Sequence, residues 1–323
     1  MKRVTIIILA CVLALSMLAA CGGNDAGSSN TPANNTPANN TPANNTPPAN
    51  NTPETPNTQN TPAPPPAANF DTNRIIAVFT REDGSGTRDA FVSITGVGDD
   101  MYIEAVVESE TNQILTKVES NETAISYVSV GSLNPSVKAL EINGVVPSDD
   151  TIMDGSYTLQ RPLLVCVNAE KANDPLVQDF IAFMLSAEGQ EHSGSRWTKI
   201  DVNAPSYASA GLSGTLKVGG STSVEPLMQR MVEAYKGLNS GVEVEISGGG
   251  SGTGINEATE GIIDIGMSSR GLRDNEKEAL TAINIALDGV AVIVNPANPI
   301  SGMTIDQVRE IFTGEVTRWN QVG

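Results

Sequence analysis

Three turns rich in glycine, serine and threonine carry the residues best suited to chemistry, and each lies between a strand-like and a helix-like stretch. They cover residues 81–87 (REDGSGT), 219–223 (GGSTS) and 247–254 (SGGGSGTG). Glycine lets main-chain N–H groups approach a ligand closely, hydroxyls add donors, and a helix N-terminus carries partial positive charge. One such turn is often only a tight connection, but three in one chain indicate an oxyanion site.

Arg81 opens the first of these turns. Its guanidinium can present a charged, two-pronged donor to the same oxyanion. Asp83, two residues further on, is predicted to hold that guanidinium in place.

The residues needed for enzyme or metal chemistry are missing from the sequence. There is no Gly-Lys pair for a nucleotide-binding loop and no Gly-x-Ser-x-Gly nucleophile motif. The single histidine, His192, lies in a polar segment, and Cys166 lies in an apolar run that predicts a buried thiol. We therefore expect a binding protein with no catalytic residues, no metal and no cofactor.

Short apolar strands alternate with amphipathic helices from about residue 70 onward, which predicts an α/β fold. The expected elements are strands over 75–79, 215–218 and 242–246, a helix from Pro226 to a stop at Gly237, a helix from Asp174 to Gly189, and a capping box at Thr304-x-x-Gln307.

The N-terminus has the layout of an export signal. Residues 1–20 carry two cations, an apolar run and small residues immediately before Cys21. The sequence Leu-Ala-Ala-Cys resembles a bacterial lipobox, so Cys21 is the expected lipidation site and the membrane is reached through this anchor only. An ordinary cleaved secretory signal is the alternative.

The segment 21–73 is expected to be a disordered tether. Eleven of the 19 prolines lie between residues 22 and 68, in repeats of Asn, Thr, Pro and Ala. An extended chain of this composition could reach roughly 100 Å. Without residues 1–20 the chain has 17 Lys and Arg against 37 Asp and Glu, a net charge of −20, which disfavours nucleic acid as a partner.

Five segments together resemble one known family, the phosphate-binding lipoprotein of the bacterial high-affinity phosphate ABC importer. They are 80–87 (TREDGSGT), 219–226 (GGSTSVEP), 247–254 (SGGGSGTG), 264–270 (DIGMSSR) and 311–320 (IFTGEVTRWN). The resemblance covers nearly all of residues 74–323.

This resemblance implies a two-lobed type II periplasmic-binding-protein fold that closes around inorganic phosphate and passes it to an ABC permease. It implies a monomer on the extracytoplasmic face of the cell membrane. The ligand contacts implied by it are Arg81, Ser85, Gly86, Thr87, Thr222, Ser223, Ser251 and Ser269.

The order of the segments differs from that of the family, and the chain looks circularly permuted. Segments like the family's C-terminal half precede those like its N-terminal half. The expected division is 74–160 and 291–323 for lobe II, 161–200 and 214–290 for lobe I, and 201–213 as a connector. A truncated tandem gene, giving a non-binding surface stalk, is the alternative.

A second departure concerns selectivity. Ser269 stands where well-known members carry an aspartate that accepts the proton of hydrogen phosphate. A carboxylate that only accepts rejects fully ionised sulfate. Asp83 and Glu225 are the two carboxylates that could take its place, and a receptor for another tetrahedral oxyanion such as sulfate stays open.

Overall fold

The computed structural model describes residues 70–194 and 196–322. The predicted signal peptide 1–20, the predicted lipidation site Cys21 and nearly all of the predicted tether lie outside these residues. Within the described part of the chain, no helix is long and apolar enough to cross a membrane.

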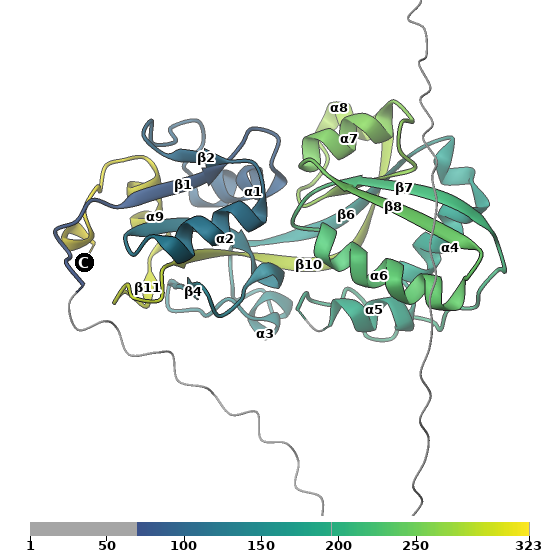
Figure 1. Ribbon diagram of the computed structural model, residues 1–323, viewed down its shortest axis with the longest axis horizontal. Helices are drawn as coiled ribbons and strands as arrows, with labels where there is room; N and C mark the ends of the chain where they lie inside the picture. The colour runs from purple at the N-terminus through teal and green to yellow at the C-terminus, as the bar shows by residue number, and fades with distance from the viewer. Residues whose placement is uncertain (1–69, 195, 323) are drawn as a thin grey trace, which may run out of the picture. The chain divides into compact units, whose positions relative to one another are not determined.

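One continuous sheet runs through the described residues in the order β2-β1-β3-β10-β6-β9-β7-β8, with β4 added on β10. β10 (Leu280–Val294) has 15 residues and links the two halves of this sheet. Its first part, to Gly289, pairs antiparallel with β6, and its last part, from Val290, pairs antiparallel with β3. We call the half on the β6 side lobe I and the half on the β3 side lobe II (Figure 1).

Lobe II holds the first part of the described chain together with its last part. Its elements are β1 (Ala77–Arg81), α1 (Gly86–Thr95), β2 (Val106–Glu108), α2 (Thr111–Ser120), β3 (Ala124–Ser129), η1 (Val130–Ser132), β4 (Lys138–Ala139), β5 (Glu141–Ile142), α3 (Asp149–Met153), β11 (Gly302–Met303), α9 (Ile305–Phe312) and η3 (Trp319–Gln321). Its core packs Phe91, Tyr127 and Phe312 ring against ring.

Lobe I is built from the middle of the chain. Its elements are β6 (Gln160–Asn168), η2 (Lys171–Asn173), α4 (Pro175–Met184), α5 (Ala187–Ser193), β7 (Gly214–Gly220), α6 (Glu225–Leu238), β8 (Val242–Gly248), α7 (Ser251–Thr259), β9 (Ile265–Ser268) and α8 (Asp274–Lys277). Its main core gathers Phe180, Phe183 and Tyr235 beneath the sheet. Residues 201–213 form no helix or strand and are mostly exposed.

Several local predictions are confirmed. Thr304 caps α9, accepting from the main-chain N–H of Gln307, whose side chain accepts from Thr304 N. The Cys166 side chain is fully buried in β6, and burial raises the pKa of its thiol to about 12. The alternation of strands and helices predicted an α/β protein, and the described fold is one.

Two predicted helix ends were wrong. Gly237 does not stop α6, which continues to Leu238. The helix predicted to reach Gly189 breaks at Ser186, whose hydroxyl caps a separate helix, α5. A Cβ at Gly189 would lie 2.1 Å from the carbonyl oxygen of Phe183, so this glycine permits close packing of two helix backbones instead of ending one.

The two ends of the described chain pair with each other in lobe II. Ile76 N donates to Thr317 O at 2.9 Å, and Asn320 N donates to Thr72 O at 2.7 Å. The indole N–H of buried Trp319 donates to Thr123 O at 3.2 Å. The C-terminus accordingly lies beside the start of the described chain (Figure 1).

Candidate functional site

The glycine-rich turns meet where the lobes face each other. Thr87 Oγ1 of lobe II and Ser223 Oγ of lobe I lie 2.7 Å apart. The main-chain N–H of Gly252 donates to Gly84 O at 2.9 Å. Because each turn follows a strand and leads into α1, α6 or α7, three helix N-termini converge on one interface.

A cluster of buried hydroxyls lies behind these contacts. Ser269 Oγ accepts from Ser221 Oγ at 2.9 Å and lies 3.4 Å from Ser251 Oγ, and all three serines are at most 2% exposed. A Cβ at Gly86 would lie 2.4 Å from Ser251 Oγ, so only glycine fits opposite this cluster. Hydroxyls can donate or accept, which suits them to the oxygens of a tetrahedral anion.

Arg81 is the cation of this site, and it is only 2% exposed at the end of β1. Its Nη1 donates to Thr111 Oγ1 at 3.2 Å, and its Nη2 donates to Thr222 Oγ1 at 3.2 Å and to Ser109 O at 3.0 Å. Thr222 belongs to lobe I, so Arg81 contacts both lobes. A buried guanidinium with hydroxyl partners is a strong site for an anion, because charge-assisted hydrogen bonds gain strength away from water.

The predicted role of Asp83 is not what the structure shows. Glu82 holds Arg81, since its two carboxylate oxygens accept from Nε and Nη2 at 2.9 Å each. The Asp83 side chain is 94% exposed and forms an ion pair with Arg88. Arg81 is the last residue of β1, and in the turn that follows only the first carboxylate folds back onto it.

The remaining predicted residues lie in the same interface. Ser85 is buried and caps α1, accepting from Arg88 N at 3.4 Å. Glu225, a candidate proton acceptor, accepts from Gln229 at 3.1 Å and lines a polar cavity together with Thr222. The eight predicted ligand contacts are therefore gathered at one interface, while their role as ligands stays a prediction.

Sequence reasoning missed four residues at this interface. Ser221 was visible in the turn 219–223 but was not singled out. No sequence motif marked Glu82 or Thr111 as part of the site. The fourth, Arg161, donates from Nη1 to Ser269 O at 3.3 Å and so supports the serine cluster from behind.

Arg161 forms a buried ion pair with Asp288 across the two strands that link the lobes. Its Nε and Nη2 donate to Asp288 Oδ2 at 3.1 and 2.9 Å. The other oxygen, Oδ1, accepts from Ser129 Oγ at 2.9 Å and from Gly131 N at 3.4 Å. Burial raises the pKa of Asp288 and lowers that of Arg161, and each charge opposes the shift of the other.

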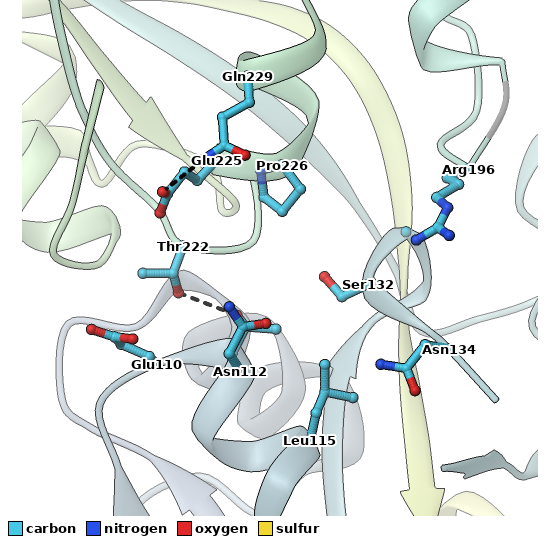
Figure 2. A pocket seen from close by; sticks show the side chains of 12 residues that line it. Glu110, Asn112, Leu115, Ser132, Asn134, Arg196, Thr222, Glu225, Pro226 and Gln229 are labelled. Atoms are coloured by element: carbon cyan, nitrogen blue, oxygen red, sulfur yellow. Dashed lines mark hydrogen bonds between the residues drawn. The ribbon is translucent and has the colours of Figure 1, made fainter. Parts of the chain in front are cut away.

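A polar cavity of about 280 Å³ opens beside the site, lined from both lobes (Figure 2). Thr111 and Thr222, which bond to Arg81, form part of its wall. Asn112, Ser132 and Asn134 face it from lobe II, and Arg196 faces it from lobe I (Figure 2). Two hydroxyl partners of the buried Arg81 thus lie in the wall of a polar cavity.

The site's chemistry is that of recognition. It offers one guanidinium, several hydroxyls and helix N-termini. Among the described residues, no three His, Cys, Asp or Glu side chains lie together as metal ligands would. Two lobes that meet around such a set of donors define a two-lobed solute-binding protein.

Comparison with known proteins agrees with this class. The model of the PBP superfamily domain matches residues 66–188 and 205–323. The phosphate-binding protein PstS 2 of Streptococcus pneumoniae serotype 4 is 42% identical over 256 residues, which cover 76% of this chain and 87% of that protein. The chain belongs to the PBP superfamily and, within it, to the PstS family of phosphate-binding proteins.

Two further relatives differ in how much they cover. The crystal structure of a phosphate-binding protein of a phosphate ABC transporter from S. pneumoniae TIGR4 is 41% identical, with a TM-score of 0.64. That match covers 77% of this chain and 100% of the solved chain. The PstS protein of Bacillus subtilis is 30% identical over 145 residues, which cover 44% of this chain and 48% of that protein.

Proposed function

We propose that this protein captures inorganic phosphate outside the cytoplasm and delivers it to the permease of a phosphate ABC importer. It is a transport binding protein and not an enzyme. The observation that carries the proposal is Arg81, a buried guanidinium whose hydroxyl partners come from both lobes. Glu82 balances the charge of Arg81, and the guanidinium also donates to hydroxyls of both lobes, so an anion bound beside it would be removed from water when the lobes close.

The proposed phosphate contacts lie in the three turns and after β9. They are Arg81, Ser85, Gly86, Thr87, Thr222, Ser223, Ser251 and Ser269, with Glu82 replacing Asp83 as the residue that orients Arg81. Support comes from their position at one interface between the lobes, where all of them except the half-buried Thr222 are buried.

Phosphate is favoured over sulfate because a carboxylate lies at the cation. Glu82 contacts Arg81, and a Cβ at Gly250 would lie 3.3 Å from Glu82 Oε1, so the carboxylate faces the turn that precedes α7. Each Glu82 oxygen accepts one bond from Arg81 and keeps a second lone pair that can take the proton of hydrogen phosphate, whereas sulfate has no proton and would face it acceptor to acceptor.

Calorimetry of the purified chain with phosphate, and then with sulfate, tests the function. We expect one phosphate per chain and much weaker sulfate binding. Strong competition by sulfate that vanishes in Ser269→Asp would instead indicate a general oxyanion receptor. Absence of heat with both anions would favour a non-binding stalk.

We further propose that the described domain is circularly permuted. The pairing of residues 72–76 with 317–320 supports this, because a permuted chain brings its new ends to the family's former internal junction. The match to about half of the B. subtilis protein is what a comparison in chain order gives for permuted sequences.

The proposed division places 74–160 and 291–323 in lobe II, 161–200 and 214–290 in lobe I, and 201–213 as a connector. The change of partner strand along β10, between Gly289 and Val290, supports the boundary at 290. Gel filtration of the chain from residue 70 onward should give a monomer. An obligate exchanged dimer would favour the truncated-tandem alternative.

Attachment to the outer face of the cell membrane through lipidated Cys21 completes the proposal. The lipobox-like sequence before Cys21 and the long tether after it support this anchor. Cys21→Ser should release the protein from membranes with no change in phosphate affinity. A wild-type protein found free of the membrane fraction would contradict the anchor.

A further inference from the structure

A second set of contacts joins the lobes outside the anion site. Asp89 lies in α1 of lobe II, and its Oδ2 accepts from Arg273 Nη2 at 2.9 Å. The same oxygen lies 2.9 Å from Arg270 Nε. Both arginines follow β9 of lobe I, so one carboxylate of lobe II contacts two guanidinium groups of lobe I.

These contacts are close in sequence to the proposed anion ligands. Asp89 is two residues from Thr87, in the first turn of α1. Arg270 directly follows Ser269. An ion pair between Asp89 and Arg270 therefore ties together the two backbone segments that carry Thr87 and Ser269.

Lobe I holds Arg270 in position before any contact with lobe II. Its Nη1 and Nη2 donate to the two carboxylate oxygens of Glu276 at 2.7 and 2.8 Å, and Nη1 also donates to Gly271 O at 2.8 Å. The side chain is only 8% exposed. Its contact with Asp89 is an ion pair by distance, since Nε is not aligned for a hydrogen bond. A guanidinium fixed in this way loses little entropy when Asp89 arrives.

Two side-chain contacts between the lobes involve groups that an anion would engage. Thr87 contacts Ser223, and Arg81 contacts Thr222, within the proposed site itself. Asp89 is not part of that site, so its ion pairs can persist while the anion occupies its own ligands.

We propose that Asp89, Arg270 and Arg273 form an inter-lobe clamp that slows release of the bound anion. The proposal rests on the proposed function, because the clamp acts on phosphate held in the closed site. When the lobes separate, Asp89 leaves with lobe II. Lobe I then keeps Arg270, Arg273 and Glu276, one net positive charge beside Ser269, which attracts an incoming anion to a protein that is otherwise strongly negative.

The test compares the rates at which phosphate dissociates from wild type and from Asp89→Asn. Each protein is loaded with labelled phosphate, and loss of the label is measured after an excess of unlabelled phosphate is added. Loss of two partly buried ion pairs should speed dissociation about tenfold. Glu243→Gln is the matched control, since it removes the same charge from an ion pair with Lys236 that lies within lobe I. The control should dissociate at the wild-type rate.

A double-mutant cycle separates the clamp from a general loss of structure. Arg273→Gln changes an exposed side chain and should also speed dissociation, while Asp89→Asn with Arg273→Gln should be little faster than Asp89→Asn alone. Additive effects, or an Asp89→Asn rate equal to wild type, would overturn the clamp. Wild type that binds no phosphate at all would instead overturn the proposed function.

Discussion

Glu82 accepts from Arg81 at both Nε and Nη2, each at 2.9 Å, and this bidentate pair fixes the plane of the Arg81 guanidinium, which is buried at the proposed phosphate site. The remaining Arg81 donors point toward Thr111 and Thr222. The Glu82–Arg81 pair thus determines which N–H groups of Arg81 can bond to an anion between the lobes.

Arg81→Lys should weaken phosphate binding about 10- to 100-fold, nearly as much as Arg81→Ala. An ammonium group cannot bond Glu82 twice and still reach the threonines and the anion. Asp83→Asn is the control and should change the affinity less than threefold, because Asp83 faces solvent. Calorimetry measures all three, and an Asp83→Asn protein as weak as Arg81→Lys would return the orienting role to Asp83.

The buried pair of Arg161 and Asp288 should matter mostly for stability. Asp288→Asn leaves a buried guanidinium without its counter-charge and should cost about 3–5 kcal/mol in the free energy of unfolding. Replacing both residues, as Arg161→Met with Asp288→Leu, should cost less than the single change. Denaturant unfolding measures the double change and both single changes, and a double change that costs as much as the two single changes added together would show that the pair is not coupled.

The buried thiol of Cys166 predicts a stability change at alkaline pH. Its folded pKa is about 12 against an ordinary 9.0, so the unfolded chain loses its proton first as the pH rises through 9. The folded protein should therefore lose about 1.3 kcal/mol between pH 8 and pH 10 from this group alone. Cys166→Ala should remove that part of the slope, and an unchanged slope would assign it to other groups.

Trp319 should be essential to the joining of the two chain ends. It is 1% exposed, packs against Phe70 and donates to Thr123 O. Trp319→Ala should cost about 3–5 kcal/mol in unfolding free energy. A thermal shift of less than a degree or two would mean that the segment 317–320 is not part of the lobe II core.

The turns that form the site could be predicted from the sequence because each is encoded by a few neighbouring residues. Glycine and hydroxyl residues between a strand and a helix indicate the same geometry wherever they occur, and Ser85, Gly86 and Ser251 lie in the expected turns. The backbone at residue 86 lies so close to Ser251 that only glycine fits there. Because this contact joins two segments that are far apart in the sequence, the local sequence pattern could not reveal it.

Contacts that depend on register could not be predicted. Arg161 and Asp288 are direct partners across β6 and β10, but they are 127 positions apart in the sequence, and only the antiparallel pairing of the two strands brings them together. The choice between Glu82 and Asp83 depends on which way the backbone turns after β1. Glycines at 189 and 237 predicted helix ends wrongly, because a glycine also serves close packing and is tolerated near the end of a helix.

The location of a bound phosphate tests the account most directly. A crystal structure of the protein grown with phosphate should show one anion between the lobes, bonded to Arg81 and to hydroxyls of the three turns, including Thr87, Ser223 and Ser251. Phosphate found only on the surface, or an interface in which Arg81 keeps its present partners and excludes the anion, would contradict it.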